Sequence, residues 1–387
     1  MPSPKILLAL AAIGASVVSA EDDCKSVTVK SASDANIDCK TVRGDIIFDE
    51  DSDIEGHVDI SGPEKVNGNI VVKKSGINSL GSSSIEKIGG KFQLQQLNQL
   101  ATIDFTALEE VNEIEWISLT ALESVKFGKD GVTTVDKVRI SDTSLSSLEG
   151  LNMASVGTFA IDNNHELTMW ETRLTEITKN LVVADNSADL EVSFPRLTNA
   201  ADIDVRGVKS LKMPLLEEIS GSFLLTDNNV MESFIAPNLT ETGESVSLRN
   251  NDGLSNVSFP LLEKTGGSLT LHNNQKLVHI DGFPKLEKVK GSVTMRGNFT
   301  EIELPALEKV DGTFDVQSTE DIEDACSTLK DVKNVGGKFK CKSENENANE
   351  GSDKDTSDDD DDAGVFLAAN APLVLSIAAI GGLLQLL

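Results

Sequence analysis

The residue types that most often carry chemistry are few and scattered in this 387-residue chain. Its histidines show no spacing typical of metal ligands, and no nucleophile elbow, phosphate loop or dinucleotide-binding fingerprint occurs. An acidic run at residues 49–53 resembles the start of an EF-hand, but Ile54 stands where that loop needs glycine and Ile60 where it needs glutamate. The sequence therefore predicts no cofactor and no metal site. The four histidines are His57, His165, His272 and His279.

Carboxylates were the other candidates for catalysis, because a glycosidase needs two of them close together. Asp204 and Asp315 each stand between two apolar positions, where an alternating strand directs a side chain away from the core. They belong to different repeats, and no repeat supplies a clear pair. We therefore predict that the protein is not an enzyme.

The four cysteines form two pairs at the ends of the repeat region, Cys24 with Cys39 and Cys326 with Cys341, each 15 residues apart. Two local disulfides would close a loop at each end, where a terminal repeat has no neighbour to cover it. The alternative is a four-thiolate zinc site, which would require the two ends of a long solenoid to meet.

Three sequons for N-glycosylation occur, at Asn238, Asn256 and Asn298. Asn238 follows a proline at an expected corner, and Asn256 precedes the next proline, so we expect both to face water and carry glycans. Asn298 occupies a repeat position that we expect to be buried, and we predict low occupancy there.

A repeated phrase built around proline fills the middle of the chain, with copies 19 to 24 residues apart. This period lies in the range of leucine-rich and related solenoids. Each copy contains an apolar-x-apolar alternation, the signature of a short strand with one buried face. The prolines are Pro195, Pro214, Pro237, Pro260, Pro284 and Pro305.

One copy of about 22 residues cannot bury its own apolar side, so the copies must stack with their strands in a parallel sheet. The fold class is therefore mainly β, a parallel β-solenoid of about twelve coils over residues 21–342 with capped ends. Glycines before the strands, such as Gly221, Gly267, Gly291 and Gly312, suit a positive φ or a close approach of two backbones.

An asparagine recurs three residues after the apolar pair, in step with the prolines. Its amide can both donate to and accept from the turn of a neighbouring coil, so we predict a buried structural ladder. The ladder residues are Asn164, Asn186, Asn228, Asn251, Asn274 and Asn298.

The two ends of the chain carry predicted targeting signals. Residues 1–20 have the charge, apolar run and small residues of a signal peptide. Residues 343–362 hold ten acids and one lysine and are expected to form a disordered stalk. Residues 363–387 complete the pattern of a glycosylphosphatidylinositol (GPI) attachment signal, with Asp362 the preferred site and Ala363 or Gly364 the next choices. The alternative is a C-terminal transmembrane anchor.

The formal net charge of −29 argues against nucleic acid as a partner. The expected partner instead is the outer membrane leaflet, reached through the GPI anchor, together with wall polysaccharide or wall proteins.

The whole arrangement resembles the fungal "extracellular mutant" and "sporulation-specific" GPI-anchored cell-wall organisation proteins, whose repeats are similar to receptor L-domains. The resemblance rests on the signal peptide, the terminal cysteine pairs, the tail and repeats of the form Leu-Pro-x-Leu-Glu-x-Val-x-Gly, as at residues 304–312 and, with Met and Ile substitutions, 213–221. It implies a non-enzymatic glycoprotein displayed on the cell surface or linked to the wall, supporting wall integrity by binding and scaffolding. A surface receptor or adhesin is the alternative, and a wall-remodelling glycosidase the third.

Overall fold

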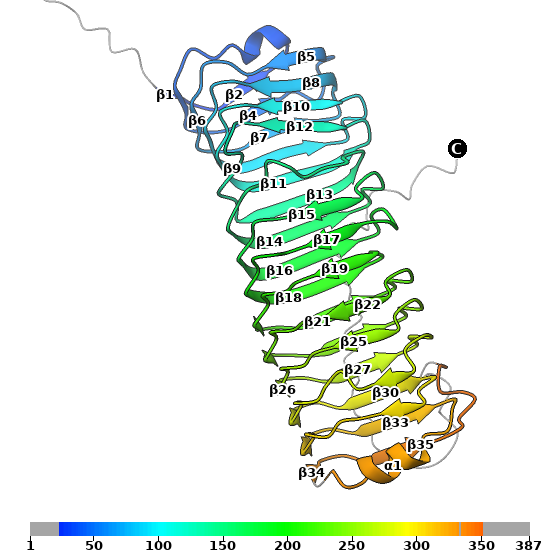
Figure 1. Ribbon diagram of the computed structural model, residues 1–387. Coiled ribbons are helices and arrows are strands. Elements are labelled where there is room, and N and C mark those ends of the chain that lie inside the picture. Colours follow the sequence, from blue (N-terminus) through cyan, green and yellow to red (C-terminus); the bar gives the residue numbers. More distant parts are fainter. Residues whose placement is uncertain (1–22, 333, 351–387) are drawn as a thin grey trace, which may run out of the picture. The chain divides into compact units, whose positions relative to one another are not determined.

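The computed structural model describes residues 23–332 and 334–350, which form one stack of β-coils running from the N-terminal end to the C-terminal end (Figure 1). The predicted signal peptide and GPI attachment signal lie outside the described residues, as does most of the predicted stalk. Within the described part of the chain, no helix is both long and apolar enough to cross a membrane.

One main strand per coil pairs in parallel with the main strand of the next coil, giving about 14 turns. The main strands are β2 (Val27–Val29), β4 (Ile46–Phe48), β7 (Ile70–Lys73), β9 (Lys87–Gln95), β11 (Glu110–Leu119), β13 (Lys137–Thr143), β14 (Ser155–Asp162), β16 (Glu176–Ala184), β18 (Asn199–Arg206), β21 (Phe223–Thr226), β24 (Val246–Arg249), β27 (Leu269–His272), β30 (Val293–Gly297), β33 (Phe314–Ser318) and β35 (Phe339–Lys342).

Short corner strands precede many of the main strands and extend the same sheet, which we call the main sheet. Where no separate corner strand exists, as in β16 and β18, the main strand is long enough to include it. The corner strands are β1 (Asp23–Cys24), β3 (Thr41–Val42), β6 (Lys65–Val66), β20 (Glu218–Ile219), β23 (Glu241–Thr242), β26 (Lys264–Thr265), β29 (Lys288–Val289), β32 (Lys309–Val310) and β34 (Asn334–Val335).

The opposite side of the stack, which we call the second face, carries four shorter parallel sheets. Their strands are β5 (Glu55–Asp59), β8 (Gly76–Ser82), β10 (Thr102–Phe105) and β12 (Ser124–Phe127); β15 (Met169–Glu171), β17 (Glu191–Ser193) and β19 (Ser210–Lys212); β22 (Ser233–Ile235) and β25 (Asn256–Ser258); and β28 (His279–Ile280) and β31 (Glu301–Ile302).

A single apolar core runs between the two faces through the whole stack. The alternating apolar residues of every main strand point into it, as the sequence pattern predicts. Aromatic rings from successive coils also contact one another: Phe234 lies 5.6 Å from Phe259, which lies 5.2 Å from Phe283, measured between ring centroids. Each coil therefore depends on its neighbours to bury its apolar side.

The predicted parallel β-solenoid is confirmed, with about 14 turns where about twelve coils were expected. The structure adds β2 and β4 at the N-terminal end, where the alternation is carried by only three residues each. No proline or ladder asparagine marks these two coils, and strands of three residues do not stand out by alternation alone.

The glycines before the main strands serve close approach and not a left-handed backbone. None of Gly221, Gly267, Gly291 and Gly312 has a positive φ. A Cβ on Gly291 would lie 2.5 Å from Ser268 Oγ and 2.7 Å from Ser268 N of the preceding coil. Of the two predicted reasons for glycine, contact between stacked backbones is the one observed.

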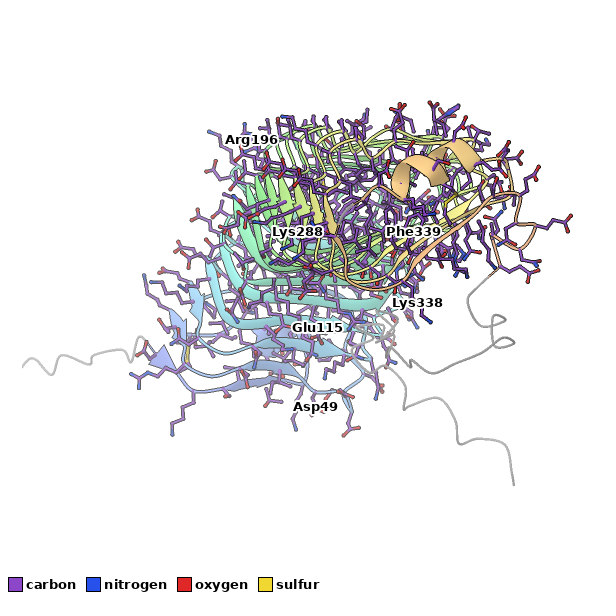
Figure 2. All side chains as sticks on the ribbon, turned by 90° about the horizontal axis from the view of Figure 1, so that it is seen from below. Asp49, Glu115, Arg196, Lys288, Lys338 and Phe339 are labelled. Carbon is purple, nitrogen blue, oxygen red and sulfur yellow. A yellow bond between two sulfur atoms is a disulfide. The ribbon has the colours of Figure 1, made fainter. Side chains whose placement is uncertain are left out.

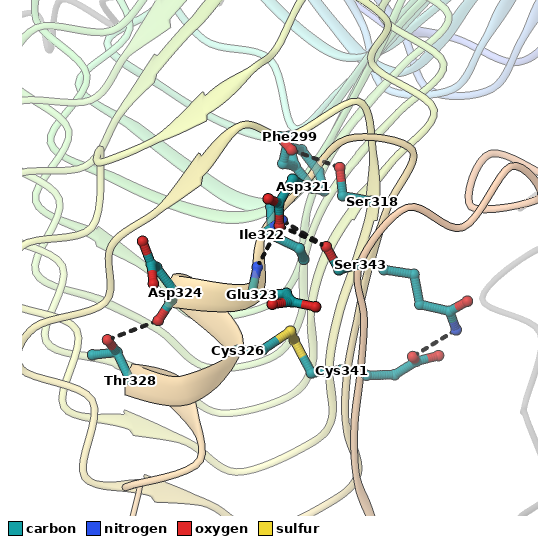
Figure 3. The surroundings of a disulfide bond; sticks show 12 residues. Phe299, Ser318, Asp321, Ile322, Glu323, Asp324, Cys326, Thr328, Cys341 and Ser343 are labelled. Carbon is teal, nitrogen blue, oxygen red and sulfur yellow. Dashed lines mark hydrogen bonds between the residues drawn. A yellow bond between two sulfur atoms is a disulfide. The ribbon is translucent and has the colours of Figure 1, made fainter.

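Both ends of the stack are closed by a disulfide, Cys24–Cys39 and Cys326–Cys341, as predicted. A 3₁₀ helix, η1 (Ala32–Ala35), accompanies the first, and helix α1 (Glu323–Leu329) carries Cys326 of the second (Figure 3). The last strand, β35, carries Lys340 and Lys342 and directly follows Lys338; Lys338 and the half-buried Phe339 are labelled in Figure 2. Charged side chains on an edge strand oppose pairing with another sheet.

The folded unit reaches Asn349, beyond the expected boundary at 342. Ala348 is fully buried, and the Asn345 backbone N–H donates to Ser318 O at 2.7 Å. The first residues assigned to an acidic stalk therefore belong to the solenoid, because they carry asparagines that bond to the last coils and an alanine that packs there.

We predict that replacing Cys326 and Cys341 with serine will loosen the last coils selectively. Closing a 15-residue loop stabilises a fold by about 3 kcal/mol in the loop-entropy model. Hydrogen exchange should speed up in β33, β34 and β35 while the central coils keep their protection. The matching Cys24/Cys39 double variant should affect only the N-terminal coils. Unchanged exchange at both ends would show that the disulfides do not stabilise the termini.

Candidate functional surface

The asparagine ladder is the first predicted feature that the structure brings together. Asn228, Asn251 and Asn274 are essentially inaccessible to solvent. Asn251 Oδ1 accepts hydrogen bonds from both the backbone N–H and the side-chain Nδ2 of Asn228, each at 3.0 Å, and Asn251 Nδ2 donates to Leu225 O at 2.9 Å. The pattern repeats between Asn251 and Asn274, and between Asn164 and Asn186. Each amide thus satisfies backbone groups of neighbouring coils.

A left-handed residue precedes every ladder asparagine in these coils. The φ angles are positive at Asn163, Asp185, Asp227, Asn250 and Asn273, between 53° and 58°. Asparagine and aspartate tolerate this conformation better than other residues with a Cβ. The turn directs the following amide into the stack, and the repeat pattern did not predict it.

Asn298 does not join the ladder, so its predicted burial was wrong. The preceding residue, Gly297, continues β30 and pairs with Ser318, which replaces the left-handed turn of the other coils. Phe299 fills the interior instead, and only 1% of it is exposed. Asn298 is half-buried at the corner, where Oδ1 accepts from Thr319 Oγ1 at 3.0 Å and from Asn349 Nδ2 at 2.7 Å.

We predict that Asn251→Ala will destabilise the central coils far more than Asn298→Ala. The first change removes four hydrogen bonds and leaves buried groups without partners, at about 1–3 kcal/mol for each unsatisfied group. The second removes bonds at a half-exposed corner, where water can replace them. Urea denaturation of the two variants measures the difference. Equal destabilisation would contradict a structural role specific to the ladder.

Two of the three sequon asparagines, Asn238 and Asn256, lie away from the outer side of the main sheet, whereas Asn298 is bonded to Asn349 at its border. Asn256 is exposed at the start of β25 on the second face. Asn238 is half-buried at a corner, where its Nδ2 donates to Pro214 O at 2.8 Å. Asn298 follows the end of β30, and burial no longer argues against a glycan there. No sequon asparagine occupies an outward position of the described main strands.

Outward side chains of the main sheet form columns, because the strands pair in register. At the N-terminal half, Lys91 Nζ contacts Glu113 at 3.1 Å and Glu115 at 3.0 Å, and Lys137 contacts Glu113 at 2.9 Å. Burial acts to raise the pKa of Glu115 (Figure 2), but hydrogen bonds from Lys91 and Gln93 outweigh it and hold the pKa below its ordinary value.

This network brings together two carboxylates that were not predicted as a pair, Glu113 and Glu115, which share Lys91. A glycosidase acid needs a raised pKa, so that it carries a proton near neutral pH. The pKa of Glu115 is instead lowered, which suits a permanently charged member of an ion-pair network. The arrangement stabilises and orders the surface, and it does not resemble an acid–base pair.

We predict that Glu115→Gln will lower the unfolding free energy at neutral pH but have little effect in acid. A carboxylate with a lowered folded pKa stabilises the fold above its unfolded pKa of about 4.3, and this stabilisation is lost as the pH falls through the folded value. Denaturation at several pH values measures it. Glu123→Gln is the control, since Glu123 is exposed and forms no ion pair with the described residues. If Glu115→Gln were still less stable than the wild type at pH 2, the lowered pKa of Glu115 would not be the cause of the destabilisation.

The outward acids Asp204 and Asp315 are each engaged by an arginine. Asp204 pairs with Arg206 of its own strand at 2.7 Å, and Asp315 pairs with Arg296 of the preceding coil at 2.6 Å. They lie in separate coils and do not form a catalytic pair. Both residues therefore lie on the outer side of their strands, as the alternation predicted, and each forms an ion pair.

The histidines are also dispersed. His57, His165 and His279 are exposed, and His279 pairs with Glu301 at 3.3 Å. His272 is half-buried on the outer side of β27. No group of three metal-ligating side chains exists within the described part of the chain.

Comparison with known proteins gives this surface its context. No family model matches the chain. A "Cell surface GPI-anchored protein" of Arthroderma benhamiae is 31% identical over 88% of this chain and 88% of its own length. "Protein ecm33" of Aspergillus fumigatus is 31% identical over 82% of this chain and 80% of its length. "Cell wall protein ecm33" of Schizosaccharomyces pombe is 27% identical over 57% of this chain and 53% of its length.

Among solved structures, a leucine-rich cell surface protein of Faecalibacterium prausnitzii is 9% identical, covering 70% of this chain and 82% of its own, with a TM-score of 0.19, too low to bear on the fold. Two of these fungal relatives match over more than four fifths of this chain at 31% identity. The resemblance drawn from the repeats is therefore confirmed, and the chain belongs to the Ecm33 family of fungal GPI-anchored cell-surface and cell-wall proteins.

Proposed function

We propose that the protein acts as a non-enzymatic scaffold, and that it binds wall polysaccharide or wall proteins through the outer side of the main sheet. One observation carries this proposal: the main sheet presents continuous in-register columns along the stack, and no sequon asparagine stands on its outward positions. Glycans at Asn256 and at the Asn238 corner would leave this side open. A repeated surface of this kind suits a repetitive or extended partner.

A GPI anchor at Asp362, Ala363 or Gly364 would hold the scaffold on the outer leaflet or deliver it to the wall. The names of the fungal relatives support this part of the proposal.

The other two candidates find less support. A receptor or adhesin that recognises a protein partner needs clustered apolar or aromatic anchors. The large exposed apolar residues among those described are spread over different coils and both faces, and they are Ile47, Met169, Leu215, Val230 and Ile235. A glycosidase needs a carboxylate with a raised pKa, and Glu115 has a lowered one.

The test compares two apolar-to-lysine variants on opposite sides of the solenoid. Leu224 is half-buried on the outer side of β21, and Ile235 is exposed on β22 of the second face. We expect Leu224→Lys to shift mature protein from the glucanase-released fraction to the phospholipase-released or soluble fraction, while Ile235→Lys behaves as wild type. Circular dichroism confirms that both variants are folded.

Equal retention of both variants in the wall would exclude the main sheet as the binding surface. Loss of wall retention in both variants would point to the second face or to the overall charge of the protein.

A further inference from the structure

One cationic column on the outer side of the main sheet differs from the rest of the surface. Arg249 of β24 is the register partner of His272 in β27, which in turn is the partner of Arg296 in β30. Parallel strands lie about 4.8 Å apart, so these side chains stand side by side. Three adjacent basic side chains are unexpected in a chain whose net charge is −29.

The arginines of this column differ in whether a carboxylate pairs with them. Arg206, two strands before Arg249 in the same column, pairs with Asp204, and Arg296 pairs with Asp315. Arg249 donates from Nε to Ser247 Oγ at 3.1 Å and has no carboxylate partner among the described residues. Burial lowers its pKa, as expected for a guanidinium withdrawn from water without a counter-charge.

His272 has the same deficit. Its Nε2 is buried and has no hydrogen-bond partner. Its pKa is lowered by burial first, then by the charges of Arg249 and Arg296, while a contact with the Asn349 backbone acts in the opposite direction. Both neighbouring groups therefore lack an acceptor that carries negative charge.

The C-terminal part of the solenoid provides a wall beside this column. The chain returns over the outer side of the last coils, where Asn345 Nδ2 donates to Gln317 Oε1 at 2.6 Å and Asn349 Nδ2 donates to Asn298 Oδ1 at 2.7 Å. Asn349 thereby comes to lie against His272. The column is thus bounded by Asn349 on the side of the last coils.

We propose that Arg249, with His272 beside it, binds an oxyanion, a phosphate or carboxylate group, carried by the ligand of the main sheet. The guanidinium fork matches the geometry of such a group and can donate two parallel hydrogen bonds to it. His272 is the register neighbour of Arg249, and its imidazole would sense the charge of an anion held by that guanidinium. This inference deepens the proposed function, because it names the chemical class that the outer side of the sheet recognises.

The test follows the four histidines of the purified mature protein by NMR during titration with inorganic phosphate. The imidazole pKa of His272 should begin below its ordinary value and rise when phosphate binds, since the anion stabilises the protonated ring. His57, His165 and His279 serve as internal references. Mannose 6-phosphate and glucuronate then distinguish a phosphate-bearing ligand from a carboxylate-bearing one.

Arg249→Gln should weaken phosphate binding by about tenfold or more, the expected loss for a charge-assisted hydrogen bond. Arg206→Gln is the matched control, because that arginine occupies the same column but already has a carboxylate partner; it should change affinity less than about twofold. Thermal unfolding of both variants shows whether they remain folded.

Three results would overturn the site: no response of His272 to phosphate, equal binding by the Arg249→Gln variant, or a His272 pKa already raised before any anion is added. Retention of each variant in the wall fraction is measured as a separate experiment from phosphate binding. If Arg249→Gln stays in the wall fraction and phosphate does not bind, the scaffold proposal stands without this site. If phosphate binds but Leu224→Lys retains wall attachment, the oxyanion site stands and the proposed binding surface fails.

Discussion

Parallel stacking in register is the constraint on which the rest of this structure depends. A single coil is too small to bury its own apolar residues, and each coil leaves its strand N–H and C=O groups to be paired by the next. The core therefore exists only between coils, as the contacts of Phe234, Phe259 and Phe283 illustrate. The same requirement explains why glycines stand where two backbones meet, and why both terminal coils are closed by disulfides.

Register also turns repeated positions into columns with a common environment. Inside the stack, the column of asparagines satisfies the turns, and the residue before each asparagine adopts a left-handed conformation that directs the amide inward. Outside the stack, columns bring together charges that are about 23 residues apart in the chain. The ion pairs of Lys91 with Glu113 and Glu115 arise in this way, and so does the placement of Arg249 beside His272.

Much of this could be predicted because the repeat is written in local patterns. The apolar alternation gave the main strands, the equal cysteine spacings gave the disulfides, and the outward positions of Asp204 and Asp315 followed from the period of a strand. Two kinds of error remained. The coils at β2 and β4 lacked the marker residues of the repeat, and Asn298 kept its marker although Gly297 and Phe299 changed the turn around it.

The sequence by itself determined the solenoid, its repeat unit, its closed ends and the resemblance to the Ecm33 family, because each depends on residues near one another in the chain. Only the tertiary structure decided which charges have partners. Three arginines occupy equivalent positions of the repeat, Arg206, Arg249 and Arg296. Arg206 pairs with Asp204 of its own strand, and Arg296 pairs with Asp315 of the next coil. Arg249 pairs with no carboxylate among the described residues. The return of Asn345 and Asn349 over the last coils was likewise invisible in the sequence, because it depends on side chains that meet only after the coils have stacked.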